Sequence, residues 1–534
     1  MVRQTTPHQI MVTVQSRATS DNSVLMESSG AKRPVDVCLA PTGAETCGQI
    51  CRFNIHETLR MEIRLPEKVN NIIKTLKNAG FEAYAVGGCV RDSLMGRIPN
   101  DWDITTNAVP TEVKKLFRRT FDTGIEHGTV TVMMGNDHFE VTTYRLDGKY
   151  SDLRHPDEVR FTGSLKEDLR RRDFTINAMA YNEEDGLKDE FDGLNDLKAG
   201  IIRAVGNAKE RFSEDALRIL RAFRFAAQLD FSIEEDTLKA AKGLRENLKG
   251  ISAERIMTEL TKILVSDHPD MIRELYGAHI TDIILPELNV CFEMDQKNMH
   301  HCYTVGEHIM QALKADATDL RSLPAEYVSP REWEDFLETC EEIEKLPDPT
   351  EGGMTRIIRF ALLFHDLGKP ACMTEDGDGS RHFKGHPAES ERIAGNVLKR
   401  LKSDNDTLQM VKKLVLYHDQ RPEAEKKALR RSINKIGKDA YRLLFRVRVA
   451  DTLAQSSYKR AEKLDYEKKL MKAYLEILKA NECVSVKDLA VNGRDLMEKG
   501  IKPGPGLGKK LEELLEIVLE DPECNTKEYL LSRL

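Results

Sequence analysis

The spacing of apolar residues divides the chain into a mixed N-terminal part and a helical C-terminal part. Residues 1–60 show no sustained helical or strand period and are rich in Ser, Thr, Gly and Pro, which predicts a disordered tail or a non-native extension. A patterned helix follows Met61. Its apolar residues recur at helical spacing: Val69, Ile72, Ile73 and Leu76. After residue 209 helical periodicity continues to the end.

Between residues 81 and 208, short strand patterns alternate with helices. AYAVGG predicts a strand, VRDSLMG a helix and DWDITT a second strand. TVTVMM and HFEVTTYR predict a hairpin around Gly135-Asn136-Asp137. The chain is therefore expected to be α+β, with a mixed-sheet head and a long all-helical body.

These patterns predict five segments. The first is the tail, residues 1–60. The others are a head at 61–208, a helical neck at 209–275, a helical body at 276–480 and a C-terminal helical tail at 481–534.

Composition fits a protein without membrane spans, and the charge is uneven. The 534 residues are 40% hydrophobic and 31% charged, with a formal net charge of -8. Residues 316–351 hold twelve acidic and three basic residues, so the rest of the chain carries +1. This acidic insert is expected to face away from a polyanionic partner. The ten scattered cysteines, without a CxxC framework, predict reduced thiols and a cytoplasmic location.

Two carboxylates in the head have the spacing of a metal site. Asp101 and Asp103 are two residues apart, which on a strand places both side chains on one face. Hard oxygen ligands held together suit Mg²⁺ ions that serve phosphoryl or nucleotidyl transfer. Upstream, Gly87-Gly88 opens a helix that carries Arg91, so backbone N–H groups and a guanidinium can reach a phosphate. Glu140 is the candidate third carboxylate, with an exposed strand Glu as the alternative.

The segment AVGGCVRDSLMGRIPNDWDITTNA resembles the catalytic signature of tRNA nucleotidyltransferases, the CCA-adding enzymes, and of the related bacterial poly(A) polymerases. The resemblance continues through RRRDFTINAMAY and FSEDALRILRAFRFAAQL, so it covers residues 81–229. It is to the bacterial and eukaryotic class, class II, and implies a polymerase β-like head, Mg²⁺, and template-independent addition of CCA to tRNA from CTP and ATP. Asp101 and Asp103 would hold Mg²⁺. The nucleotide would contact Gly88, Arg91, Arg172, Arg221 and Arg224.

The resemblance also assigns base reading to Asp215 and Arg218, which lie three apart on one expected helix. Cytosine and adenine present an amino donor beside a ring-nitrogen acceptor, whereas guanine and uracil present the reverse. An Asp acceptor beside an Arg donor fits the first two bases and leaves unpaired polar groups with the others. The alternative is an ordinary salt bridge, which the basic strip of Arg218, Arg221 and Arg224 weakens because few acids accompany it. The loop at 146–163 resembles the family's flexible loop, with a plain surface loop as the alternative.

The body carries a second candidate metal centre. His365-Asp366 ends an apolar helix, and other His and Asp residues lie at expected helix ends. The pattern resembles the HD phosphohydrolase superfamily and implies a second divalent metal. The implied ligands are His301, His365, Asp366 and Asp451, with His386 and His418 as supplementary groups; His308 or His300 are alternatives to His301. The centre is either a phosphohydrolase or an inherited scaffold.

Two segments are candidates for contact with RNA. Residues 426–438 hold six basic residues and no acidic one, and a helix is expected to begin near Lys509 and Lys510. The expected partners are tRNA, CTP and ATP, without DNA or a membrane. The alternatives are a CC-adding or A-adding enzyme, a poly(A) polymerase, or an HD phosphohydrolase with an RNA-binding head.

Overall fold

We describe the protein from a computed structural model, which describes residues 63–148, 159–323, 329–350 and 352–534. All of them belong to one compact unit, Ile55–Leu534. The expected tail at 1–60 lies outside the described residues. So does the middle of the 146–163 loop.

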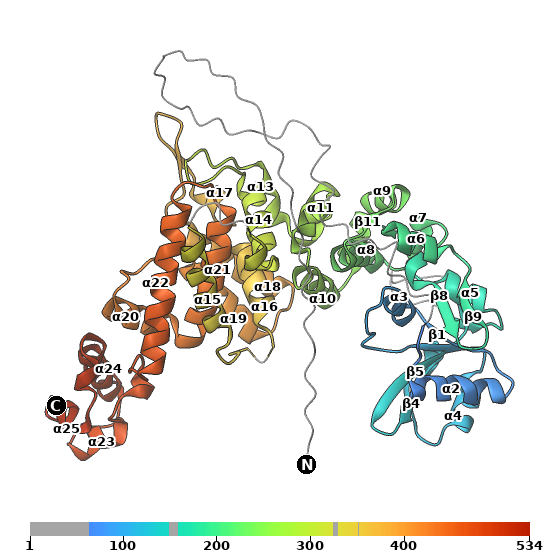
Figure 1. The fold of residues 1–534 in the computed structure, drawn as a ribbon, viewed down its shortest axis with the longest axis horizontal. Helices are drawn as coiled ribbons and strands as arrows, with labels where there is room; N and C mark the ends of the chain where they lie inside the picture. The colour runs from blue at the N-terminus through green and yellow to red at the C-terminus, as the bar shows by residue number, and fades with distance from the viewer. Residues whose placement is uncertain (1–62, 149–158, 324–328, 351) are drawn as a thin grey trace, which may run out of the picture. The chain divides into compact units, whose positions relative to one another are not determined.

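The head combines a sheet with short helices (Figure 1). Its strands are β1 (Ala83–Val86), β2 (Ile104–Thr106), β3 (Thr120–Gly124), β4 (Thr129–Met134), β5 (Asp137–Thr143), β6 (Arg145–Asp147), β7 (Val159–Phe161), β8 (Met179–Asn182) and β9 (Gly186–Asp189). Its helices are α2 (Glu67–Asn78), α3 (Gly88–Leu94), α4 (Pro110–Leu116), α5 (Leu165–Arg170) and α6 (Gly193–Ala199).

Seven strands form one mixed sheet in the order β3-β4-β5-β2-β1-β8-β9. Only β2 and β5 pair in parallel in this sheet; the remaining neighbours are antiparallel. The expected hairpin is confirmed as β4 and β5. Helix α2 packs on β1 and β2, and its buried residues are the four that the spacing indicated: Val69, Ile72, Ile73 and Leu76. The α+β architecture is confirmed.

The neck begins where the sheet ends. It contains α7 (Ala208–Glu214), α8 (Leu217–Leu229), α9 (Glu235–Gly243), α10 (Ala253–Leu264), α11 (Ile272–Gly277) and α12 (Thr281–Ile284). Helices α8 and α10 pack against each other. A short parallel pair, β10 (Ile201–Ile202) with β11 (Ser232–Ile233), links this region to the end of the head.

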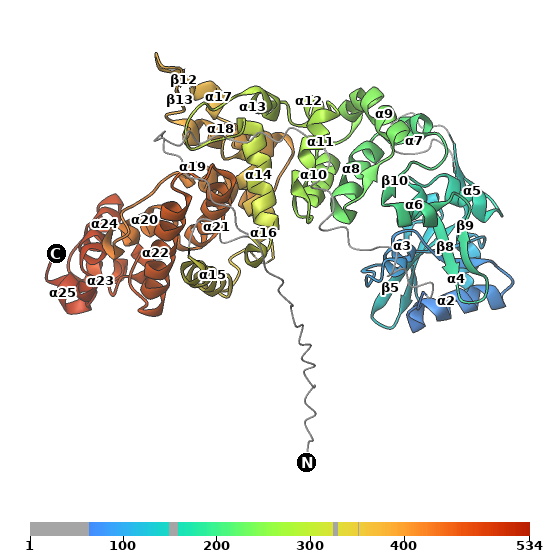
Figure 2. The ribbon, with the colours of Figure 1, turned by 45° about the horizontal axis from the view of Figure 1, so that its top comes forward.

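The body is helical except for one small hairpin, β12 (Thr374–Glu375) with β13 (Arg381–His382). Its helices are α13 (Asn289–Glu293), α14 (Val305–Ala317), α15 (Pro330–Glu344), α16 (Met354–Phe364), α17 (Lys369–Cys372), α18 (His386–Arg400), α19 (Asn405–Tyr417), α20 (Lys426–Ile436), α21 (Lys438–Ala454) and α22 (Arg460–Lys479). Helices α14, α16 and α21 pack together, and α19 contacts both α16 and α21 (Figure 2).

The expected basic surface at 426–438 is largely neutralised in the folded chain. Lys427 and Arg431 pair with Glu520, and Arg430 pairs with Glu482. Glu520 ends α24 (Pro505–Glu520), so these contacts join α20 to the C-terminal region. That region also contains α23 (Gly493–Glu498) and α25 (Lys527–Leu531) around a small apolar core of its own.

One further expectation is revised, in the tail. The acidic insert contains helix α15, which packs on the body: Asp335 pairs with Lys468 and Lys472 of α22, and Trp333 is buried. Lys509 and Lys510 lie beyond the first turn of α24, because that helix begins at Pro505. No helix among the described residues is both long and apolar enough to cross a membrane.

Gly306 in α14 is required by the close approach of a neighbouring helix. A Cβ there would lie 2.6 Å from Cγ and 2.7 Å from the backbone N of Phe292 on α13. We expect Gly306→Ala to lower the free energy of unfolding by about 1–3 kcal/mol, since backbone cannot yield as a flexible side chain can.

The matched control is Gly243→Ala at the end of α9, where a Cβ would meet nothing within 4 Å. That change should raise stability by up to about 1 kcal/mol through helix propensity and a less flexible unfolded chain. Thermal unfolding followed by circular dichroism measures both. Equal melting temperatures for the two variants would contradict the packing argument.

Candidate active site and metal centre

The three head carboxylates come together because of strand register. Asp101 and Asp103 precede β2 instead of lying within it, and the Asp103 carbonyl accepts a hydrogen bond from Val86 N–H of β1. Ile104 is the parallel partner of Val141, so the preceding residues lie side by side: Asp103 just before β2 and Glu140 within β5. All three carboxylates are exposed.

The electrostatics of Asp103 agree with this placement. Desolvation raises the pKa of its carboxyl above the usual range against the attraction of Arg172, and the charges of Glu140 and Asp101 raise it further. Like charges held close together favour a bound cation. Carboxylate oxygens held close together are the donor set that Mg²⁺ prefers, so these residues fit that ion.

Two guanidinium groups lie beside the glycine turn that follows β1. Gly87 has φ +87°, a conformation that favours glycine, and a Cβ on it would lie 3.0 Å from an Nη atom of Arg172. A Cβ on Gly88 would lie 3.7 Å from an Nη atom of Arg91. Arg172 is held 3.7 Å from the buried carboxylate of Asp168, and its Nε has no hydrogen-bond partner among the described residues. The turn and the two cations form a surface suited to phosphate.

Asp173 connects this surface to the neck. Its carboxylate accepts hydrogen bonds from Arg221 Nε at 2.8 Å, from its neighbour Phe174 N–H at 2.9 Å and from Asn177 Nδ2 at 3.2 Å. Asn177 Oδ1 in turn accepts from Arg91 at 2.6 Å. Although burial opposes the charge of Asp173, Arg221 holds the pKa of that carboxyl well below its usual range.

The aromatic ring of Phe225 packs against three cations. The guanidinium carbons of Arg91, Arg221 and Arg224 lie 5.1, 5.4 and 4.1 Å from its centre. Phe225 also makes an edge-to-face contact with Phe174 of the head, at 5.8 Å. Cation–π attraction and apolar burial therefore join helix α8 to the phosphate surface.

The structure corrects the expected geometry of the base-reading pair. Asp215 and Arg218 are not on one helix, because Asp215 lies in the break between α7 and α8. Their backbones are joined by a hydrogen bond from Arg218 N–H to the Asp215 carbonyl, but their side chains do not pair: that of Asp215 binds Arg255 and that of Arg218 binds Glu214.

Each arginine in the basic strip on α8 has an acidic partner, contrary to the expectation from the sequence. Arg218, Arg221 and Arg224 pair with Glu214, Asp173 and Glu259 respectively. The residues that neutralise Arg221 and Arg224 come from segments distant along the chain.

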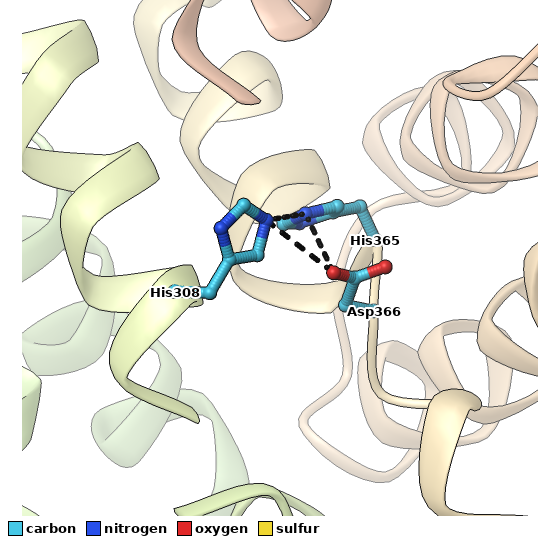
Figure 3. A group of neighbouring side chains, drawn as sticks. All are labelled: His308, His365 and Asp366. Atoms are coloured by element: carbon cyan, nitrogen blue, oxygen red, sulfur yellow. Dashed lines mark hydrogen bonds and ion pairs between the residues drawn. The ribbon is translucent and has the colours of Figure 1, made fainter. Parts of the chain in front are cut away.

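A cluster of histidines and aspartates is buried in the body. His308 of α14 and His365, directly after α16, bring their Nε2 atoms to 3.2 Å, and His308 Nε2 lies 3.4 Å from Asp366 Oδ2 (Figure 3). Asp451 of α21 lies 3.0 Å from His308 Nε2. On the other side of Asp366, His386 and His418 bring their Nε2 atoms to 3.3 Å.

The tautomers of these four histidines are set by backbone carbonyls. In each ring Nδ1 lies within hydrogen-bond distance of a main-chain oxygen, those of Ala454, Leu362, Phe383 and Val415. With the proton on Nδ1, each Nε2 presents a lone pair to the cluster. Burial lowers the pKa of His418 to about 3, which keeps that ring neutral.

Neither buried oxygen of Asp366 accepts a hydrogen bond among the described residues, although Lys369 Nζ lies 2.7 Å from Oδ2. Converging lone pairs and an unsatisfied carboxylate are what a divalent cation requires. These residues therefore fit a metal ion.

His308, the alternative to His301, is the histidine that gathers with His365 and Asp366, whereas His301 lies outside that group. His301 contacts the ring of His308, with ring centres 5.0 Å apart, and burial lowers its own pKa to about 2. His300 pairs instead with Lys463 at the surface. His308 lies on helix α14, four residues after the N-cap Thr304, a placement that spacing alone did not distinguish.

Comparison with known proteins matches three regions of the chain. Residues 83–203 match a model described as "Poly A polymerase head domain", and residues 230–292 match "Probable RNA and SrmB- binding site of polymerase A". Residues 388–534 match a model of tRNA nucleotidyltransferase domain 2.

Curated relatives decide the family. A CCA-adding enzyme of Lactobacillus helveticus is 38% identical over 386 residues, which cover 70% of this chain and 93% of that relative. This chain belongs to the CCA-adding enzyme family. Family relatives from Leuconostoc mesenteroides (46% identical) and Lactiplantibacillus plantarum (52% identical) match 46% and 40% of this chain. In both, the match spans less than two thirds of the relative's own length, 63% and 52%.

Solved structures of CCA-adding enzymes share the fold. The enzyme of Bacillus stearothermophilus in complex with CTP has a TM-score of 0.60 and 28% identity, over 87% of this chain and 96% of that chain. The Thermotoga maritima enzyme complexed with tRNA has a TM-score of 0.53 and 22% identity, over 88% of this chain and 95% of that chain. The nucleotidyltransferase fold of this family member is thereby shown, and its family generally uses a divalent metal.

The sequence pattern of this family member did not indicate the residues that position the predicted site residues. Asp173 and Asn177 stand within the motif RRRDFTINAMAY, yet nothing in the spacing distinguished them from structural polar residues. Arg255 and Glu259 lie in a helix that showed only an amphipathic pattern.

The Asp173–Arg221 pair should contribute measurably to stability. We expect Asp173→Asn to lower the free energy of unfolding at pH 7 by about 2 kcal/mol, below the value for a fully buried pair because one third of the Arg221 side chain is exposed. The folded-state pKa of Asp173 is lowered, so its contribution is complete above the unfolded pKa of about 4. The deficit should therefore shrink as the pH falls below about 4.

Chemical denaturation between pH 3 and 8 measures this difference. Asp137→Asn serves as the control, because Asp137 forms an exposed pair with Lys68 and should cost no more than about 1 kcal/mol. A deficit for Asp173→Asn that grows as the pH falls would refute the assignment.

Proposed function

We propose that this chain adds CCA to the 3′ end of tRNA, using CTP and ATP without a nucleic-acid template. The observation that carries the proposal is the convergence of Asp101, Asp103 and Glu140 with Arg172 and the Gly87-Gly88 turn. Binding alone needs no such carboxylates, which would repel RNA phosphates without a metal. The family relatives and the CTP complex of the Bacillus stearothermophilus enzyme support the same activity.

In this proposal the 3′-hydroxyl of tRNA attacks the α-phosphate of the nucleotide, and pyrophosphate leaves. Arg91, Arg172 and Arg221 bind the triphosphate through charge-assisted hydrogen bonds. Asp101 and Asp103, with Glu140 beside them, would hold Mg²⁺, which supplies positive charge for the reacting phosphate oxygens. Asp215 accepts from the base amino group and Arg218 donates to the ring nitrogen, so cytosine and adenine are preferred.

The same head could serve an enzyme that adds only CC, only A, or a poly(A) tail. Purified protein is incubated with tRNA lacking one, two or three terminal nucleotides and with labelled CTP or ATP singly. The proposal requires C incorporation on the two shorter tRNAs and a single A on the tRNA that ends in CC. Failure with ATP indicates a CC-adding enzyme, failure with CTP an A-adding enzyme, and long A tails a poly(A) polymerase.

The carboxylates should be essential for this reaction. We expect Asp101→Ala and Asp103→Ala each to lower incorporation by at least about a thousandfold, because the metal would lose a ligand while the fold keeps its core. Glu112→Ala is the control, since Glu112 forms a surface pair with Lys115. Activity of the two Asp variants near that of the control would refute the proposed site.

We further propose that the buried cluster around Asp366 is an HD-type metal centre that hydrolyses phosphoesters. The supporting observation is the group formed by His308, His365 and Asp366, with a second group formed by Asp366, His386 and His418. A divalent ion held there would supply the Lewis acid for hydrolysis. Lys369, buried beside Asp366, adds a positive charge suited to phosphate.

Metal binding should depend on this cluster. We expect purified protein to carry a divalent transition metal by elemental analysis, and His365→Ala combined with Asp366→Ala to lose it. Chelation should lower the melting temperature of the unaltered protein but not that of the double variant. His382→Ala, which removes an exposed histidine, is the control. Protein without metal and without activity on phosphoesters would rule out the hydrolytic function.

The proposed partners follow from these sites: tRNA, CTP and ATP, and not DNA. Seven cysteines among the described residues are free thiols, which supports a reducing, cytoplasmic location. Because the 426–438 segment is largely neutralised, the turn before α24, with Lys509 nearby, is the better remaining candidate for a phosphate contact.

A further inference from the structure

Arg448 of α21 is a fully buried cation whose closest contacts are with backbone oxygens. Its Nε donates to the main-chain oxygen of His418 at 3.3 Å, and one Nη atom donates to the main-chain oxygen of Gln420. Its other Nη atom lies 3.8 Å from a carboxylate oxygen of Glu467 and has no hydrogen-bond partner in the part of the chain that the structure describes. The guanidinium therefore binds the main chain more closely than it binds its counter-ion.

The two backbone oxygens lie at the end of α19. A helix leaves its last carbonyl groups without internal partners, and a cationic side chain can satisfy them. His418 is the C-terminal cap of α19, so Arg448 fixes the residue at which that helix ends. The ring of His418 faces the histidine and aspartate cluster, where its Nε2 lies 3.3 Å from that of His386 and 3.8 Å from Asp366 Oδ1. The backbone contact thus sets the position from which this ring reaches the cluster.

Two contacts from α22 hold the same segment. Glu467 accepts a hydrogen bond from Arg421 at 2.9 Å, and the Tyr466 hydroxyl donates to the main-chain oxygen of Pro422. The fully buried carboxylate of Glu467 lies between the guanidinium groups of Arg421 and Arg448 and offsets part of both charges. The segment that follows α19 is therefore held by side chains of two helices, α21 and α22.

Stability alone does not account for a buried arginine at this position. Replacing a buried ion pair by apolar residues of similar size often leaves stability unchanged or raises it. An apolar residue cannot fix the direction of two carbonyl groups, whereas the rigid fork of a guanidinium can. Helix α21 also carries Asp451, about one turn after Arg448, and Asp451 lies 3.0 Å from His308 Nε2. One helix thereby reaches the cluster directly through Asp451 and indirectly, through the main chain, at His418.

We propose that Arg448 is a positioning residue of the metal centre, which orients His418 through its backbone. This inference rests on the proposed metal centre and extends it to a residue that need not touch the ion. Removing a group that orients a metal ligand typically lowers metal affinity about 10–100-fold. A role in stability alone would lower the melting temperature and leave the affinity for the metal and its ligand geometry unchanged.

Arg448→Met tests this role in the purified full-length protein. Bound metal is first removed with a chelator. Co²⁺ affinity is then measured by titration, and the visible absorption of the Co²⁺ form reports the ligand geometry. We expect the affinity to fall about tenfold or more and the absorption bands to shift. Arg448→Lys is the second variant if Arg448→Met does not fold: it keeps a charge beside Glu467 but offers one ammonium to two carbonyl groups, so the affinity should fall less.

Arg442→Met is the matched control. Arg442 is also a buried arginine of α21, and it donates to the main-chain oxygens of Ile343 and Glu344 at 3.1 and 3.0 Å. These oxygens lie at the end of α15, which carries none of the proposed ligands. The control should lower the melting temperature without changing the Co²⁺ affinity or absorption.

A second comparison uses His418→Ala. If Arg448 acts through His418, Arg448→Met should add nothing to the loss of Co²⁺ affinity that His418→Ala causes. Unchanged affinity and absorption in folded Arg448 variants would overturn the inference, as would an equal loss in Arg442→Met or additive losses in the double variant. Failure of the unaltered protein to bind Co²⁺ would refute the proposed metal centre itself, and the inference with it.

Discussion

The buried carboxylate of Asp173 is the contact on which the geometry of the head depends. It binds Arg221 of α8 and Asn177 of the segment before β8, and Asn177 binds Arg91 of α3. Three segments distant in sequence are thereby joined through hydrogen bonds to one charge. Because the carboxylate is almost completely desolvated, an unpaired state would be costly, and the arrangement is strongly specified.

The body also buries a carboxylate, that of Asp366, but does not satisfy it with hydrogen bonds. The histidines around it donate their Nδ1–H groups to main-chain oxygens, and neither oxygen of Asp366 accepts a hydrogen bond from the described residues. The charge of Asp173 is offset in the head by Arg221, whereas that of Asp366 is offset in the body by the neighbouring histidines and Lys369. Because neither oxygen of Asp366 accepts a hydrogen bond from the described residues, the cluster is suited to a cation.

Local patterns predicted those features that depend on neighbouring residues in the chain. The helix with Val69 and Leu76 and the hairpin around Gly135 were correct, because amphipathic period and turn chemistry act over a few residues. The placement of Asp215 and Arg218 on one helix was wrong, since Asp215 lies in the break after α7 and is bound by Arg255, forty residues away in sequence. The 426–438 segment was expected to be free, but its neutralising glutamates come from other helices.

The sequence by itself therefore determined the α+β class and the family resemblance, which the fold and the comparisons confirm, and it indicated Asp101 and Asp103 as candidate metal ligands. These depend on residue type and short spacing. Only the tertiary structure decided that Glu140 lies beside Asp103, that His308 and not His301 joins Asp366, and that α10 supports Asp215. Each of those depends on strand register or on helices meeting across the core, where packing and the pairing of buried charge select partners that sequence distance does not reveal.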